Sequence, residues 1–204
     1  VNGGVYADIT TPVLATGINA VTGQTGCTPS PCWNWTVPNN ISQQVRVRAV
    51  SEADTTVFDN SDYDFAIRGG FTWTYPTTVG TVFKSGETKT ITWTTTGNMA
   101  NVNLEYSTNN GFSYAAMLDG GGLPATNILN SGTFDWPVPT NVVSKDVFLR
   151  VTGANDPNST TTTQKIKIAG VLSIAAPAGG VRWGVNMTQQ IKWTTTGPTA
   201  NIKI

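Results

Sequence analysis

The sequence predicts an all-β protein built from antiparallel sandwiches in tandem, and three observations lead to this prediction. Residues 91–97 (ITWTTTG) return almost unchanged at residues 191–197 (IKWTTTG), with Trp93 and Trp193 100 residues apart. Apolar and polar residues alternate over short segments, which is the period of a half-buried strand. Breaks rich in Gly, Pro and Asn separate these segments, and no segment has a sustained helical period.

The repeat divides the chain into copies of one unit. Residues 1–69 are expected to form the back part of one repeat, residues 70–170 a complete repeat, and residues 171–204 the front part of a third. Only residues 69–70 and 169–170 lie between neighbouring copies. Because such short junctions leave little room for a flexible tether, we expect the units to pack end to end as a fairly stiff rod.

The first expected strand covers residues 33–37 (WNWTV), and it recurs one repeat later. Alternate residues keep an aromatic, aromatic and aliphatic face in both copies: Trp33, Trp35 and Val37 correspond to Phe134, Trp136 and Val138. Because side chains two apart share one face of a strand, this is predicted to be an inward face.

The following strands repeat in the same way. One has its inward residues at Val45, Val47 and Ala49, matched by Val147, Leu149 and Val151. The next covers residues 64–67, matched by 165–168, and closes the unit. Residues 71–76 and 172–177 then open the units that follow.

The complete repeat should contain seven strands, near residues 71–75, 88–95, 101–107, 112–118, 132–138, 146–152 and 163–168. Seven short strands in about a hundred residues are typical of an immunoglobulin-like antiparallel sandwich. A barrel is the alternative. The expected core aromatics are those at positions that are apolar in both copies: Trp35, Trp93, Trp136 and Trp193.

Composition excludes several function classes. Charged residues make up 12% of the 204 residues, twelve of each sign, with no basic stripe for nucleic acid. No apolar stretch is long enough to span a membrane. With no histidine, neither a Ser-His-Asp nor a Cys-His arrangement can form, so we expect no enzymatic activity and no catalytic residues.

Two cysteines lie close together, at Cys27 and Cys32, with two prolines between them. This pattern favours a disulfide-closed loop tip and an oxidising, extracellular or cell-surface setting. A lone metal site or two free thiols are the alternatives, although zinc lacks the further ligands it needs. The chain begins at Val1 without a start Met, as expected of a processed or excised piece of a secreted protein.

An acidic loop is the best candidate for a bound ion. It carries Asp59, Asp62 and Asp64, whose oxygens at nearly alternate positions would suit calcium. The matching stretch of the second copy, residues 160–164, has no acid at all, which favours a solvated turn. No cofactor other than calcium is expected.

Four aromatics fall outside the repeated apolar positions. They are candidates for a junction, an inter-subunit contact or a ligand surface: Tyr63, Tyr75, Phe112 and Trp183. Scattered rings do not make a carbohydrate-binding platform, so packing at the core or a junction is the favoured interpretation.

Together these stretches resemble a known pattern. Residues 177–180 (PAGG), 91–93 (ITW), 106–111 (YSTNNG), 136–139 (WPVP) and 149–151 (LRV) look like the tandem immunoglobulin-like repeats of large bacterial secreted and surface proteins. Those are similar in turn to the Ser/Thr-rich repeats of fungal cell-wall proteins. The resemblance implies an extracellular spacer, adhesive or lattice-forming role and no catalytic residues. The Gly-Gly pair before the second strand of a unit occurs only in the third unit, and Tyr114 stands where the pattern often has Trp.

The function expected from these observations is structural and non-enzymatic: a segment of an extracellular fibre, stalk or surface layer. The split end domains could complete one another by strand exchange between chains, which would make the protein a homopolymer. A longer array that has been cut is the plainer alternative. The competing function is an adhesin or a carbohydrate-binding accessory module with a glycan or surface ligand.

Overall fold

The computed structural model describes residues 35–51, 53–199 and 201–204, and this part of the chain is all-β without a helix. The chain divides into two compact units, Val1–Arg68 and Gly69–Ile204. Cys27 and Cys32 lie outside the described residues, as does Trp33.

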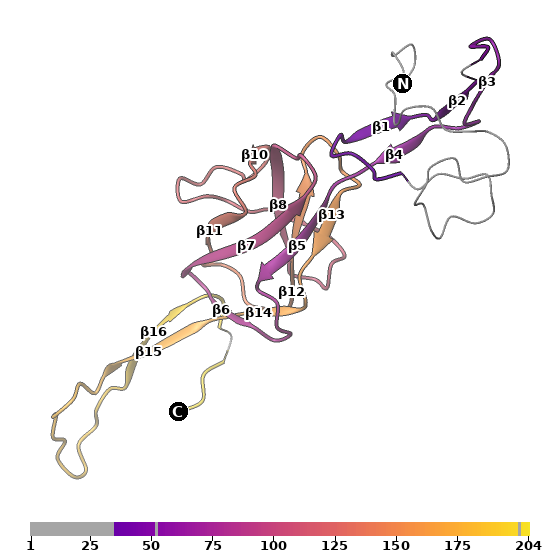
Figure 1. The fold of residues 1–204 in the computed structure, drawn as a ribbon. Helices are drawn as coiled ribbons and strands as arrows, with labels where there is room; N and C mark the ends of the chain where they lie inside the picture. The colour runs from indigo at the N-terminus through magenta and orange to yellow at the C-terminus, as the bar shows by residue number, and fades with distance from the viewer. Residues whose placement is uncertain (1–34, 52, 200) are drawn as a thin grey trace. The chain divides into compact units, whose positions relative to one another are not determined.

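The complete repeat within the second unit contains two sheets (Figure 1). One has three antiparallel strands in the order β11 (Thr133–Pro137), β7 (Thr88–Thr96) and β5 (Gly70–Tyr75). The other runs in the order β10 (Ile128–Leu129), β8 (Asn101–Ser107), β12 (Ser144–Gly153), β14 (Ile166–Ala169) and β6 (Val82–Lys84). Two short strands flank it: β9 (Ala115–Ala116) on β8 and β13 (Thr160–Thr162) on β12.

The core of the second unit lies between these two sheets. Its buried side chains come from both: β5, β7 and β11 supply Phe71, Trp73, Ile91, Trp93 and Trp136, and the other sheet supplies Phe83, Val102, Leu104, Val147, Leu149, Val151, Ile166 and Ile168. Trp136 contacts the ring of Phe83 from β6 and the ring of Tyr106 from β8. This architecture is sandwich-like, and Trp93 and Trp136 are sealed inside it.

Two of the three core tryptophans, Trp93 and Trp136, differ in hydrogen bonding. The Trp93 indole N–H donates to Oδ1 of Asn130 at 2.9 Å. The Trp136 indole N–H is fully buried and finds no acceptor among the described residues. Because an unsatisfied buried donor costs free energy, Trp136 contributes through packing alone.

Three details of the complete repeat differ from the prediction. The strand expected over residues 112–118 is reduced to β9, because residues 109–113 form a turn in which Ser107 and Asn109 accept backbone N–H groups. The strand expected over 163–168 begins later, as β14, and the strand β13 that precedes the expected range was not predicted; both pair with β12. Strands β6 and β10 were not predicted, since two or three residues carry too little alternation to detect.

The second unit ends in a two-stranded hairpin, β15 (Val171–Ala176) with β16 (Lys192–Thr196). Trp193 of β16 was predicted to be a core residue, and that prediction is wrong: its side chain is 38% exposed. The reason is that the hairpin forms a sheet of its own, and no second sheet covers its apolar face within the described residues.

The first unit has four described strands in two pairs. β1 (Ser42–Val45) pairs with β4 (Phe65–Ile67), and β2 (Arg48–Val50) pairs with β3 (Phe58–Asn60). The strand expected over residues 33–37 is not found in its described part: residues 35–37 lie outside any strand, and Val37 is exposed. Its counterpart β11 pairs with β7, and no strand equivalent to β7 occurs in the described part of the first unit.

Candidate functional site

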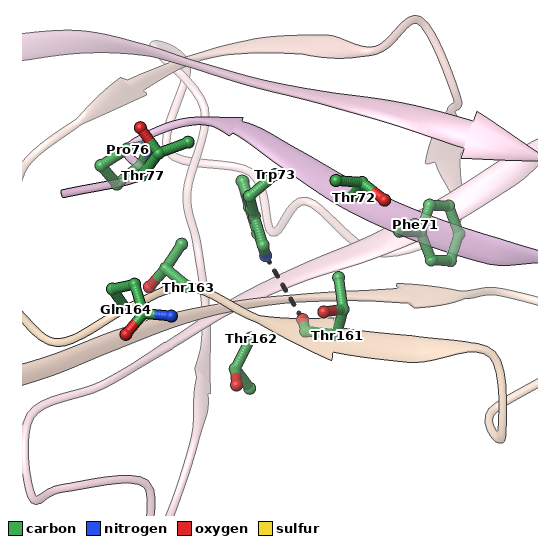
Figure 2. Close-up of a pocket in the computed structure, with 9 residues that line it drawn as sticks. All are labelled: Phe71, Thr72, Trp73, Pro76, Thr77, Thr161, Thr162, Thr163 and Gln164. Carbon is green, nitrogen blue, oxygen red and sulfur yellow. Dashed lines mark hydrogen bonds between the residues drawn. The ribbon is translucent and has the colours of Figure 1, made fainter. Parts of the chain in front are cut away.

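A shallow pocket of about 260 Å³ lies between β5 and β13 in the complete repeat (Figure 2). Nine residues line it: Phe71, Thr72, Trp73, Pro76, Thr77, Thr161, Thr162, Thr163 and Gln164. Its polar groups are threonine hydroxyls and the amide of Gln164, and the Trp73 indole N–H donates to the Thr161 carbonyl at 3.4 Å. No lining residue titrates near neutral pH, so the pocket offers no acid or base and suits a neutral polar ligand at most.

The acidic loop of the first unit does not converge on an ion. Asp64 forms an ion pair with Arg46, and its carboxylate oxygen lies 2.5 Å from the Arg46 Nε. The three aspartates are also split between β3, which holds Asp59, and the bend that follows. Among the described residues, no three acidic or sulfur ligands gather closely enough to hold a metal. In this structure the carboxylates of Asp59, Asp62 and Asp64, the candidate calcium ligands, are therefore not brought together as a ligand set.

Two carboxylates of this unit are perturbed for local reasons. The Arg46 side chain, which donates a hydrogen bond to Asp64, lowers the pKa of that carboxyl below its usual 3.8. The hydroxyl and the backbone N–H of Thr56 both donate to Asp54 and lower its pKa in the same direction. Both carboxylates serve structural contacts.

The four predicted surface aromatics do not form a platform. Phe112 and Tyr63 are largely exposed on their own. Tyr75 stacks on the ring of Phe83, with 6.0 Å between ring centroids, and Trp183 lies half-exposed after β15. Within the second unit, no ring contact joins Tyr75, Phe112 and Trp183. Trp35, predicted to be a core residue, is half-buried, and among the described residues its ring lies edge-on to the ring of Phe65.

The strongest structural feature is the repetition of strand register at both ends of the chain. In the tail hairpin β15–β16, Val171 pairs with Thr196 and Ile174 with Trp193. In the complete repeat, Gly70 pairs with Thr96 and Trp73 with Trp93. Both pairs have their irregularity directly after these positions, between Ile174 and Ala176 and between Trp73 and Tyr75. The tail hairpin therefore has the register of the β5–β7 pair.

The first unit reproduces the opposite sheet. Ser42 pairs with Ile67 and Val45 with Phe65 across β1 and β4. Ser144 pairs with Ile168 and Val147 with Ile166 across β12 and β14, again with a register shift between the two positions. The β2–β3 pair matches β12–β13 in the same way. The head strands thus have the registers of β12, β13 and β14.

Both partial repeats expose the side chains that the complete repeat buries. In the tail, Ile191 is 42% exposed, whereas Ile91 is fully buried, and Leu172 and Ile174 are exposed where Phe71 and Trp73 are buried. In the head, Phe65 is 37% exposed, whereas Ile166 is fully buried. We call the tail residues Leu172, Ile174, Ile191 and Trp193 the tail face, and the head residues Val45, Val47, Ala49, Phe65 and Ile67 the head face.

A further member of this set was missed in the sequence. Gly86 follows β6 with a φ of 83°, and Asn186, 100 residues later, has a φ of 68°. Aligning these positions places Trp183 at the position of Phe83, which is fully buried in the complete repeat. The signal that could have found it is the tolerance of Asn for the left-handed backbone that Gly adopts.

The junction between the complete repeat and the tail hairpin is tight. A Cβ on Gly197 would lie 2.9 Å from Cγ2 of Val143 and 3.0 Å from Oγ of Ser85. The Ser85 hydroxyl, itself buried, donates to the carbonyls of Pro139 and Val142. Loops of the complete repeat therefore pack directly on the turn after β16.

Comparison with known proteins identifies no relatives: no protein-family model matches the chain, and no curated protein matches it significantly. Within the described residues, no helix is long and apolar enough to cross a membrane.

Proposed function

We propose that this chain is a non-enzymatic structural repeat protein, a segment of an extracellular fibre, stalk or surface layer. The observation that carries the proposal is that both ends repeat strand registers of the complete repeat. The head has the register of β12 with β14, and the tail has the register of β5 with β7. The repeated feature of this chain is a half-buried strand pair, and no reactive group recurs with it. Such a chain is suited to bear mechanical load or to hold other parts of a structure at a fixed distance.

We further propose that each repeat is an immunoglobulin-like sandwich. Support comes from the strand orders of the complete repeat. The order β5-β7-β11 corresponds to strands A, B and E of such a domain, and β8-β12-β14 corresponds to C, F and G. The fourth strand of the ABED sheet has no counterpart; β9 and β10 pair with β8 instead.

The mechanism would be mechanical, with stiff domains in series. The packing of Gly197 against Val143 and Ser85 supports a junction with little freedom. The pocket between β5 and β13 has threonine hydroxyls but no acid or base beside them to activate a nucleophile, which favours a role without catalysis. An extracellular location rests on the expected disulfide between Cys27 and Cys32.

The experiment is backbone ¹⁵N relaxation of the full chain at low concentration. If the junction is stiff, amides of β7 and β16 will report the same rotational correlation time. Val143→Gly, which removes the contact with Gly197, should shorten the correlation time of β16 alone. Val79→Gly is the control, because Val79 is exposed on the turn before β6. A wild-type β16 that tumbles independently of β7 would refute the stiff-spacer function.

A glycan-binding module is the second candidate, and the uncharged, hydroxyl-lined pocket is the observation that favours it. Sugar hydroxyls could exchange hydrogen bonds with Gln164 and the adjoining threonines. Glycan-array binding lost in Gln164→Ala and kept in Phe112→Ala would support this candidate. Absence of binding by the wild-type chain would remove it.

A further inference from the structure

We propose that the tail of one chain docks on the head of a second copy, so that the two partial repeats form one sandwich. The tail face would cover the head face, and Trp183 would enter the shared core. This inference rests on the proposed structural function and names the partner that its exposed faces fit.

The complete repeat shows what covers each face. Behind Trp73 and Trp93 lie β8, β12, β14 and β6, and the head strands β1, β2, β3 and β4 reproduce the registers of β12, β13 and β14. The tail hairpin reproduces β5 and β7. The described residues of each end thus expose a face that the strand set at the other end of the sequence is suited to cover.

Residues 181–184 of the tail could also form backbone hydrogen bonds with the head. Their counterpart β6 is a strand because it pairs in parallel with β14, with Phe83 opposite Ile168 and Val82 opposite Lys167. In the tail the same segment is not a strand and Trp183 is 42% exposed. The described part of the tail holds no strand equivalent to β14, so the segment lacks its ladder partner.

The head supplies that partner, since β4 occupies the place of β14. Transferring the β6–β14 register places Trp183 opposite Ile67 and Arg182 opposite Ala66, in parallel. Trp183 would then take the buried position of Phe83. Addition of an extended segment to a sheet edge is an established mode of association, in which backbone hydrogen bonds provide affinity and pockets provide specificity.

Charge favours the same pairing. Residues 1–68 contain three arginines and six carboxylates, a side-chain charge of −3, and residues 171–204 contain Arg182, Lys192 and Lys203 and no carboxylate, a charge of +3. Residues 69–170 are neutral, with six charges of each sign. Opposite ends therefore attract and like ends repel, which selects head-to-tail contacts.

The consequence is a heterologous contact. Because the surface on the tail differs from the surface on the head, repeated docking yields rings or open filaments, depending on whether the rotation closes. Association should weaken as salt screens the attraction between the two ends.

The decisive test is a register-specific cross-link in the full chain. Ala66→Cys with Arg182→Cys is treated with a short bifunctional thiol reagent, which can span neighbouring strands about 4.8 Å apart. We expect a ladder of dimers and higher species, with the residue 66 and residue 182 peptides joined, as identified by mass spectrometry. That identification separates these links from any formed by Cys27 or Cys32.

The matched control is Ala66→Cys with Thr188→Cys, which places the second thiol six residues beyond the expected register. Its yield should be at least about tenfold lower. Equal yields in the two variants would overturn the register. A link between residues 66 and 182 that forms only within single chains would refute docking on a second copy. A chain that stays monomeric at high micromolar concentration would refute it as well.

A second variant tests the docking through the affinity of self-association. Trp183→Ala should weaken self-association, measured by sedimentation velocity, by at least about 30-fold, as expected for an aromatic anchor buried at the centre of an interface. Leu129→Ala is the control, because it removes an exposed aliphatic side chain from β10 in the neutral complete repeat. Unchanged association in Trp183→Ala would overturn the docking.

Failure of the docking proposal can be distinguished from failure of the proposed spacer function. The relaxation experiment measures a junction inside one chain at low concentration, whereas cross-linking and sedimentation measure contact between chains. A stiff junction in a monomeric protein would leave the spacer function standing and remove the docking.

Discussion

Trp93 and Trp193 hold the same place in the same strand pair, yet only Trp93 is buried. Trp93 lies opposite Trp73, and Trp193 lies opposite Ile174, the residue equivalent to Trp73. Their side chains are 3% and 38% exposed. The difference arises from the second sheet, which covers β7 and has no counterpart over β16 in the described part of the chain.

Replacing core tryptophans by phenylalanine should separate hydrogen bonding from packing. Trp93→Phe loses the bond to Asn130 as well as ring volume, whereas Trp136→Phe loses ring volume and removes an unsatisfied donor. We expect Trp93→Phe to lower the free energy of unfolding by about 1 kcal/mol more than Trp136→Phe. Urea denaturation of both variants measures this difference, and a costlier Trp136→Phe would contradict it.

Asn130 should be sensitive to loss of its amide N–H₂. Its Nδ2 donates to the Met99 carbonyl at 2.8 Å and to the Thr95 hydroxyl at 3.0 Å. Asn130→Asp places a carboxylate oxygen against that carbonyl, so we expect a loss of at least about 1–3 kcal/mol in the free energy of unfolding at pH 7. Asn155→Asp, at an exposed position, is the control and should change stability little.

Gly197→Ala should disturb the junction more than Gly180→Ala disturbs its own turn. Both glycines have positive φ, 88° and 81°, so both variants carry the backbone cost of about 1–2 kcal/mol. Only at Gly197 would the new Cβ also meet Val143 and Ser85, since nothing lies within 4 Å of a Cβ at Gly180. Hydrogen exchange of the β16 amides should therefore be faster in Gly197→Ala. Equal exchange in the two variants would mean that the junction is loose.

The Arg46–Asp64 pair predicts a specific pH dependence. Because the pKa of Asp64 is lowered in the folded chain, its contribution to stability is present above its unfolded pKa, near 3.9, and is lost as pH falls through the folded value. Arg46→Met should raise the pKa of Asp64, measured from the ¹³C shift of its carboxyl. Arg48→Met is the control, because the Arg48 Nε donates to Asn60 instead. A pKa of Asp64 that does not change in Arg46→Met would contradict the pairing.

Sequence periodicity was sufficient to predict the range of a strand where that strand is long and paired on both sides. β7 and β8 lie within a residue of their expected ranges, because alternate residues such as Ile91 and Trp93 must all face the core. It was insufficient for β6, which is only three residues long and is a strand because of its parallel pairing with β14. The position of Trp183 was missed for the same reason.

The acidic loop shows a different limit. Spacing places Asp59, Asp62 and Asp64 near one another in the chain, which made them candidate cation ligands, although the comparison with residues 160–164 favoured a solvated turn. The structure gives Asp64 a partner 18 residues away, Arg46, which spacing within the loop cannot reveal. Side chains that meet across strands depend on register, and register is a tertiary property.

The sequence by itself determined the repeat, the all-β class and the faces along each strand, because alternation of apolar residues is local and is copied with the unit. Tertiary structure alone decided which of those faces are covered. Burial depends on whether an opposing sheet is present, so closely similar strands hold Trp93 between two sheets and leave Trp193 exposed in a two-stranded hairpin.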